Sequence, residues 1–172
     1  MHNVEMLEGR RLMSTAPFGV TPEGTLLVQG TDGDDAIVVT SSGSTFTVGI
    51  NVLQGFVFTG VTRVQLEGSA GNDQIVYRGD ADVPVELLGG GGRDTLHGDG
   101  PHVTLSGGDA NDDLFAEGSA GMFLVGGRGG DRMFGSVGND TFFGCAGDDY
   151  AEIVTPGDVL LDYFYRMFAV AD

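Results

Sequence analysis

The sequence predicts an all-β fold, a parallel β-roll or β-solenoid of about seven 18–21-residue turns with a short C-terminal capping segment. Three observations favour it. A glycine-rich nonapeptide recurs between Gly89 and Glu152, each copy carries an Asp at one fixed position, and an apolar residue follows that Asp by two places. Because side chains alternate along a strand, the apolar residue points inward from a short strand. Stacked copies can bury an apolar face that one copy cannot.

The two clearest copies read Gly-Gly-Gly-Gly-Arg-Asp-Thr-Leu-His at 89–97 and Gly-Gly-Arg-Gly-Gly-Asp-Arg-Met-Phe at 126–134. Weaker copies begin at Gly107, Gly135 and Gly144. A flexible Gly/Asp-rich linker would share this composition. A linker, however, needs no apolar residue at a fixed offset from each Asp, so the periodic apolar position favours the solenoid.

These copies match the pattern G-G-x-G-x-D-x-U-x, where U is apolar, and resemble the RTX family of haemolysin-type calcium-binding repeats. The glycines permit positive φ and a close approach of backbone carbonyls to an ion, and Asp supplies a hard charged oxygen suited to Ca²⁺. The resemblance implies that calcium lies between loops one turn apart. The implied metal ligands are the carboxylates of Asp73, Asp94, Asp112, Asp131, Asp140 and Asp149, with carbonyls offered by Gly89, Gly91, Gly107, Asp109, Gly126, Arg128, Gly144 and Ala146.

The implied sites are unequal. The pairs Asp94/Asp112, Asp112/Asp131 and Asp131/Asp149 are 18 or 19 residues apart, whereas Asp73 and Asp94 are separated by 21. Asp140 falls on the opposite edge of the roll and lacks a good partner, and Asp35 lacks a neighbouring Asp loop. We therefore expect a mostly one-sided ladder of calcium sites.

The interval of 38 residues between Asp35 and Asp73 equals two turns of 19. The missing loop would lie at Gln54, followed by the apolar Phe56. The inward apolar positions would then be Ile37, Phe56, Ile75, Leu96, Leu114, Met133 and Ala151. Alternatively, residues 41–44 close a hairpin between strands at 36–40 and 45–48, because the second turn alternates in the opposite phase.

The two ends differ from the roll, which we place at residues 24–155. Residues 1–23 are predicted to form a leader or a disordered tail, and residues 7–14 loosely resemble the LEPRxLLS motif near the start of many large exported bacterial proteins. Residues 156–172 are a capping segment or resemble a type I secretion signal, with Asp158 as a candidate helix N-cap. A cap would cover the exposed sheet edge and apolar end of the solenoid.

Composition narrows the function. The formal charge is −17, and all eight basic residues are Arg. This charge argues against nucleic acid as a partner and favours cations. The single Cys145 excludes an internal disulfide, no Cys/His cluster suggests zinc, and no run of 18 apolar residues suggests a membrane span. The first 18 residues also lack the apolar core of a secretory signal peptide.

The leading hypothesis is a non-enzymatic, calcium-binding β-roll that is secreted or lies at the cell surface, with Ca²⁺ as its cofactor and type I secretion machinery as a candidate partner. His97 and His102 flank Asp99, but neither has a nucleophile at a recognisable spacing, so we expect no enzymatic activity. Two alternatives remain open: the C-terminal roll of a larger exported enzyme of protease or lipase type, and an adhesive or matrix module whose protein or polysaccharide partner is unknown.

Overall fold

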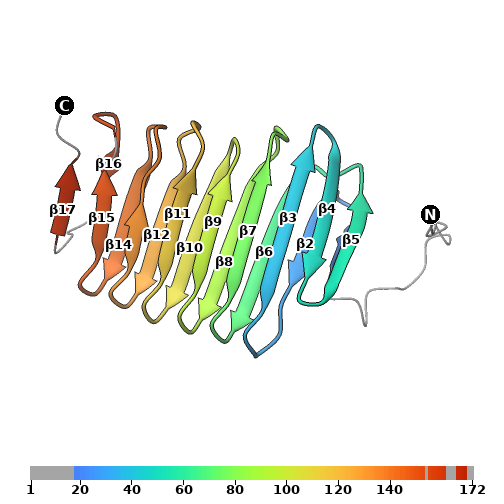
Figure 1. Cartoon of the computed structure of the whole chain (residues 1–172), viewed down its shortest axis with the longest axis horizontal. Coiled ribbons are helices and arrows are strands. Elements are labelled where there is room, and N and C mark those ends of the chain that lie inside the picture. Colours follow the sequence, from blue (N-terminus) through green and yellow to red (C-terminus); the bar gives the residue numbers. More distant parts are fainter. Residues whose placement is uncertain (1–17, 154, 162–165, 170–172) are drawn as a thin grey trace.

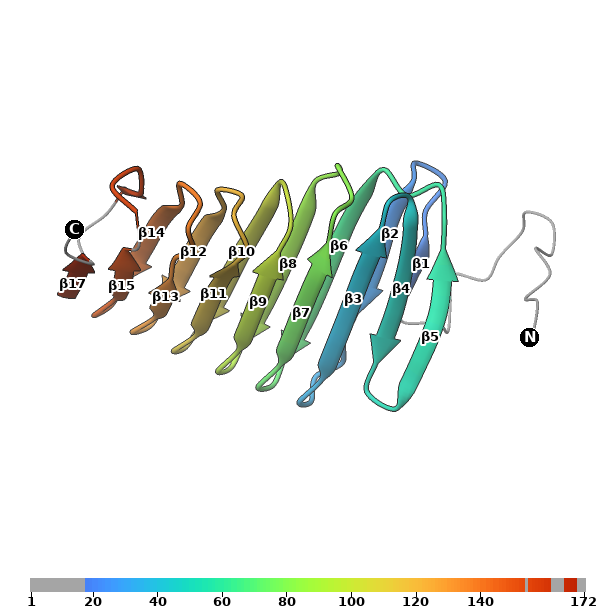
Figure 2. The same cartoon turned by 45° about the horizontal axis from the view of Figure 1, so that its top comes forward.

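Two β-sheets run along the described part of the chain, and from β5 to β17 the chain passes from one sheet to the other at each loop (Figures 1 and 2). The structure, a computed structural model, describes residues 18–153, 155–161 and 166–169. The first sheet contains β1 (Phe18–Val20), β2 (Thr25–Gln29), β6 (Arg63–Ala70), β8 (Val85–Gly91), β10 (Val103–Asp109), β12 (Phe123–Arg128), β14 (Thr141–Ala146) and β16 (Val159–Leu160), in that order. The second contains, in order, β17 (Arg166–Ala169), β15 (Tyr150–Ile153), β13 (Arg132–Phe134), β11 (Asp113–Glu117), β9 (Thr95–Asp99), β7 (Gln74–Gly79), β3 (Ala36–Ser42), β4 (Thr45–Ile50) and β5 (Leu53–Phe58).

The core lies between the sheets and is made of equivalent residues stacked turn on turn. In the second sheet the register aligns six of the seven predicted inward positions, and these six are fully buried: Ile37, Ile75, Leu96, Leu114, Met133 and Ala151. The seventh, Phe56, pairs with Val48 in an antiparallel strand and is partly buried. In the first sheet Leu66, Leu87, Leu105, Leu124 and Phe142 align in the same way and are also fully buried. The predicted all-β parallel solenoid is therefore confirmed.

The number of turns differs from the prediction. Within the described residues, five consecutive parallel turns run from β6 to β15, with a spacing of about 19 residues. The proposed turn around Gln54 and Phe56 is wrong, because β3, β4 and β5 form an antiparallel meander. The alternative hairpin is confirmed. Gly43 makes its turn with φ of 56°, and the opposite phase of this segment points Phe46 and Val48 into the core.

At the N-terminal end, β1 pairs antiparallel with β2 and lies inside the range assigned to the leader. The LEPRxLLS-like residues lie outside the described part of the chain. At the C-terminal end, β16 and β17 pair in parallel with β14 and β15. Asp158 leads into β16, so its predicted role as a helix N-cap is wrong. Leu160 packs against the core, whereas Leu161 is 56% exposed.

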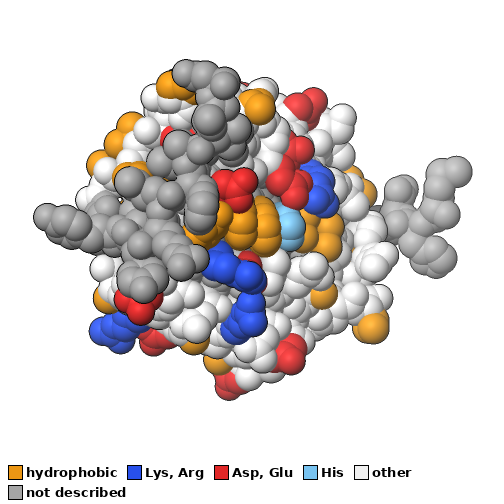
Figure 3. All heavy atoms as spheres, turned by 60° about the vertical axis from the view of Figure 1, so that its left-hand side comes forward, with side chains coloured by type: hydrophobic (Ala, Val, Ile, Leu, Met, Phe, Trp, Pro, Cys, Tyr) orange, Lys and Arg blue, Asp and Glu red, His pale blue; other side chains and the backbone are white. Residues whose placement is uncertain are grey.

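The outer face of the second sheet carries a column of stacked rings. His97 lies 4.6 Å from Phe115, and Phe115 lies 4.7 Å from Phe134, in each case between ring centroids with nearly parallel planes. Figure 3 shows a hydrophobic stripe that includes a histidine, between acidic and basic side chains. Next to the rings, Asp113 accepts hydrogen bonds from Arg93 and Arg132. These contacts join turns without any ion.

Candidate metal centre

The Asp residues of the loops that lead from the first sheet to the second form one continuous column. Each backbone N–H donates to the Oδ1 atom of the Asp one turn further along the chain. The bonds are Asp35 to Asp73, Asp73 to Asp94, Asp94 to Asp112 and Asp112 to Asp131, each 2.8 Å, and Asp131 to Asp149, 2.9 Å. The ladder predicted from the repeat spacing is therefore continuous across the 21-residue interval between Asp73 and Asp94.

The second carboxylate oxygen of these residues is the unusual feature. The Oδ2 atoms of Asp73, Asp94, Asp112 and Asp131 are buried, and within the described residues they have no hydrogen-bond partner. The side chains are at most 2% exposed. An ionised oxygen buried without a donor is costly, so a row of four such oxygens indicates that another positively charged group belongs there.

The backbone of these loops keeps its own N–H groups away from Oδ2. In the loop before Asp94, Gly90 and Gly92 have φ of 111° and 114°, in the left-handed region that glycine enters freely. The corresponding residues before Asp112, Gly108 and Ala110, have φ of 119° and 85°. We call a loop with positive φ at four and two residues before its Asp an open loop.

In the loops before Asp94 and Asp112, the first glycine lies directly beside the unpartnered oxygen. A Cβ added to Gly89 would overlap Asp94 Oδ2 and lie 2.5 Å from the Gly107 carbonyl oxygen of the next turn. A Cβ added to Gly107 would likewise overlap Asp112 Oδ2 and lie 2.7 Å from the Gly126 carbonyl oxygen. A carboxylate oxygen and a carbonyl oxygen from adjacent turns thus converge on one space that only glycine leaves free.

The predicted carbonyl ligands fall into two groups. In the first group, each carbonyl oxygen lies against the first glycine of the preceding turn. These carbonyls belong to Gly89, Gly107, Gly126 and Gly144, and the glycines they approach are Gly68, Gly89, Gly107 and Gly126, respectively. The sequence analysis missed Gly68, where an added Cβ would overlap Asp73 Oδ2 and approach the Gly89 carbonyl oxygen. Gly68 precedes Asp73 by five residues, the same spacing as Gly89 before Asp94, and this spacing could have identified it.

In the second group, the carbonyls of Gly91, Asp109 and Ala146 already accept backbone N–H groups of the preceding turn, at 2.8, 3.2 and 2.7 Å. A carbonyl oxygen has two lone pairs, so these bonds leave one free for a cation. The side chains of Asp109 and Arg128 are exposed and 3.5 Å apart. The sequence analysis predicted only the backbone carbonyls of Asp109 and Arg128 as calcium ligands, not their side chains.

Burial perturbs the acidity of the column. Burial raises the pKa of Asp94 to about 6, of Asp112 to about 7 and of Asp131 to about 6. The hydrogen bond from the preceding Asp amide lowers each pKa, and repulsion from neighbouring Asp charges raises it further. Burial also raises the pKa of Asp73. The ionised column is therefore unfavourable by itself, and a bound cation would reverse the direction of these shifts.

Asp113 shows the contrast with its neighbour Asp112. Burial would raise the pKa of Asp113, but the hydrogen bonds and charges of Arg132 and Arg93 hold it below its usual value. The two adjacent carboxylates therefore have different environments: Asp112 lies in the column and Asp113 on the outer face of the second sheet.

Asp140 lies at the other edge of the roll, as predicted, but it has a partner that sequence reasoning missed. Its backbone N–H donates to Asp158 Oδ1 at 2.9 Å, and its own Oδ1 accepts the Met122 N–H at 2.8 Å. The 18-residue interval between Asp140 and Asp158 was the signal, hidden by the assignment of Asp158 to a helix.

The two histidines in the described part of the chain are each paired with a carboxylate. His97 Nδ1 lies 2.8 Å from Glu117 Oε1, and His102 Nε2 lies 2.9 Å from Asp82 Oδ1. Among the described residues, no group of three or more His, Cys, Asp or Glu side chains could hold a metal ion. The open loops offer backbone oxygens beside their carboxylates. The described residues also contain no helix that could cross a membrane.

The donor set fits calcium, which takes several oxygen ligands from carboxylates and carbonyls in flexible geometry. Stacked open loops with a buried carboxylate column define a calcium-binding parallel β-roll. The family model described as RTX calcium-binding nonapeptide repeat (4 copies) matches residues 63–84, 88–121 and 123–151. The chain belongs to this family, and its repeats bind Ca²⁺. No curated protein and no solved structure matches the chain.

Proposed function

We propose that this protein is a calcium-dependent structural module, in which ions held between adjacent open loops make the roll stable. The observation that carries the proposal is the column of buried Oδ2 atoms at Asp73, Asp94, Asp112 and Asp131 without hydrogen-bond partners in the described structure. Bound calcium supplies the positive charge that this column lacks.

The ligands of one site come from two turns. Asp94 Oδ2 and the Gly107 carbonyl converge beside Gly89, and Asp112 Oδ2 and the Gly126 carbonyl converge beside Gly107. Asp149 continues the column through its Oδ1 atom. Each ligand set therefore ties one loop to the next and stabilises the stacked form but not the separated loops.

The energetic effect grows with the number of sites. With a dissociation constant of about 10⁻⁴ M, free calcium of about 1 mM stabilises the folded state by about 1.4 kcal/mol per site. Several sites together are comparable with the whole stability of a small domain. Calcium is abundant outside cells and scarce in the cytosol, so we propose that folding accompanies export to the extracellular space or cell surface.

Two observations support a role without catalysis. The buried carboxylates face a space lined by glycine and backbone atoms, and both described histidines are paired with carboxylates on the surface. We therefore propose that calcium has a structural role here and that the roll is not itself an enzyme.

Circular dichroism during a calcium titration tests the proposal, with magnesium as the control cation. Magnesium requires a small octahedral site and keeps its waters, so it should substitute poorly. We expect chelated protein to lose β signal and expand, and calcium but not magnesium to restore both. A compact β structure that survives thorough chelation unchanged would contradict the proposal.

A further inference from the structure

Three Asp-containing loops of this protein differ from the open loops because their carboxylates are already satisfied. They precede Asp35, Asp140 and Asp158. In each, a Ser or Thr three or four residues before the Asp donates to the carboxylate from both its backbone N–H and its hydroxyl. We call these sealed loops.

Asp140 illustrates the seal. Its side chain is fully buried. Oδ2 accepts the Ser136 N–H at 2.6 Å and the Ser136 hydroxyl at 3.2 Å, and Oδ1 accepts the Met122 N–H. Ser136 and Gly138 have no positive φ, in contrast with the equivalent positions of the open loops. The hydrogen-bond donors of the loop therefore occupy the directions from which an ion would approach Oδ2.

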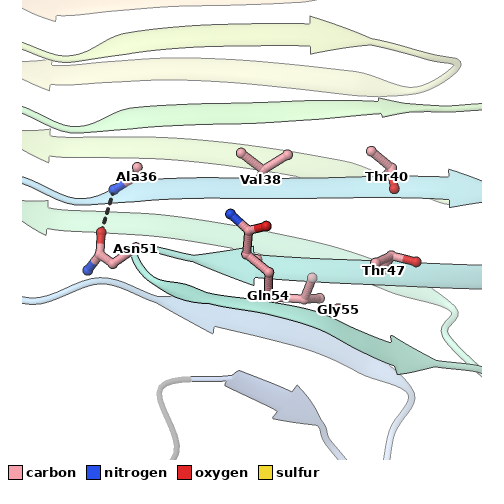
Figure 4. A pocket seen from close by; sticks show the side chains of 9 residues that line it. Ala36, Val38, Thr40, Thr47, Asn51, Gln54 and Gly55 are labelled. Carbon is pink, nitrogen blue, oxygen red and sulfur yellow. Dashed lines mark hydrogen bonds between the residues drawn. The ribbon is translucent and has the colours of Figure 1, made fainter. Parts of the chain in front are cut away.

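Asp35 ends the column in the same manner. Its Oδ2 accepts the Thr31 N–H at 2.6 Å and the Thr31 hydroxyl at 2.9 Å. Its Oδ1 accepts a hydrogen bond of 2.5 Å from the side-chain amide of Asn51. In each later turn of the column, the donor to the equivalent oxygen is the backbone N–H of the preceding Asp. Asn51 lies between β4 and β5 and also accepts the Ala36 N–H (Figure 4). The antiparallel insertion thus closes the N-terminal end of the ladder.

The electrostatics of Asp35 agree with this difference. Burial would raise its pKa, but the hydrogen bonds from the Thr31 amide, Asn51 and the Thr31 hydroxyl lower it below the usual value. Burial instead raises the pKa of Asp94, Asp112 and Asp131. In Asp35, hydrogen-bond donors of Thr31 and Asn51 surround both carboxylate oxygens.

We infer that the sealed loops at Asp35, Asp140 and Asp158 do not bind calcium, and that Thr31, Ser136 and Thr155 stand in place of the ion. The sealed loops lie outside the run of open loops. Asp35 begins the column and donates its N–H to Asp73, whereas Asp140 and Asp158 are paired on the opposite edge of the roll. The inference rests on the proposed function, because it assigns calcium to the open loops alone.

The test compares Asp140→Asn with Asp112→Asn, which change the same atoms in a sealed and an open loop. Isothermal titration calorimetry with calcium counts the ions, and thermal melts are recorded across the calcium titration. We expect Asp140→Asn to keep the wild-type ion count and to lower the melting temperature equally at every calcium concentration. Asp112→Asn should bind fewer ions, and its loss of melting temperature should grow with calcium.

Ser136→Ala provides the second variant if Asp140→Asn does not fold, because it removes only the hydroxyl of the seal. It too should keep the ion count. Loss of an ion in Asp140→Asn or Ser136→Ala, with a calcium-binding wild type, would overturn the inference and leave the proposed function intact. A wild type that binds no calcium would overturn both.

Discussion

The glycine beside the unpartnered oxygen provides the sharpest test of where the ion lies. Gly89 and Gly91 belong to the same loop, and neither has a left-handed φ. A Cβ at Gly89 would overlap Asp94 Oδ2 and approach the Gly107 carbonyl, whereas a Cβ at Gly91 would meet no atom of the described chain within 4 Å. We predict that Gly89→Ala abolishes one calcium site and that Gly91→Ala, the matched control, abolishes none.

The size of the effect follows from two contributions. Forcing a methyl group against fixed backbone atoms costs about 1–3 kcal/mol, and losing one site removes about 1.4 kcal/mol at about 1 mM calcium. In a chain of 172 residues, each kcal/mol lowers the melting temperature by about 2–4 °C, so the total is on the order of 10 °C. Gly91→Ala should be neutral or slightly stabilising, because alanine restricts the unfolded chain.

Thermal melts in calcium and calorimetric ion counts measure both effects on the same samples. The reasoning fails if Gly89→Ala and Gly91→Ala melt together and bind the same number of ions. A Gly89→Ala protein that melts early but keeps its full ion count would show that the methyl group only strains the loop, and the ion would then lie elsewhere.

Three further predictions follow from the same geometry. Asp112→Ala and Asp131→Ala should each damage two adjacent sites and Asp140→Ala none, because its loop is sealed; equal calorimetric losses for all three would argue against a one-sided ladder. The pKa values of Asp94, Asp112 and Asp131 are raised above the ordinary 3.8. These groups therefore stabilise the chelated protein most below about pH 3.8, and this stabilisation is lost as the pH rises through about 6 to 7. Its β signal should therefore be greater near about pH 5 than near about pH 8, while calcium should bind better at the higher pH; a β signal that rises with pH in chelator would refute this. Deleting residues 158–172 should make the calcium-loaded protein self-associate in light scattering, because β14 and β15 would become exposed edges; a truncated protein that stays monomeric would favour the secretion-signal interpretation.

Most of the solenoid could be predicted because its determinants are local. Leu96, Leu114 and Met133 each follow an Asp by two residues, and a strand places them inward whatever the rest of the chain does. The interval from Asp35 to Asp73 was misread because it has the length of two turns while its side chains alternate for a hairpin. There, the phase of Phe46 and Val48 was better evidence than the spacing.

The difference between open and sealed loops could not be predicted from residue types. Ser69 and Ser136 both precede an Asp by four residues, yet Ser69 has φ of 87° and leaves Asp73 Oδ2 without a described partner, whereas Ser136 seals Asp140. The two serines have different neighbours. Ser69 pairs with Gly90 of an open loop, and a Cβ on Gly90 would overlap the Ser69 carbonyl, so the backbones of these two loops are in close contact. The turns beside Ser136 are different: the preceding turn donates the Met122 N–H to Asp140, and in the following turn the Thr155 hydroxyl of a sealed loop lies 3.0 Å from the Gly138 carbonyl oxygen. Matching conformations are not required, because the sealed Asp35 loop lies directly beside the open Asp73 loop in the same column. Each space beside a first glycine, however, is bounded by oxygens of two adjacent turns. It follows that calcium binding is a property of adjacent turns together, and that a single nonapeptide, however well it matches the repeat, does not specify a site.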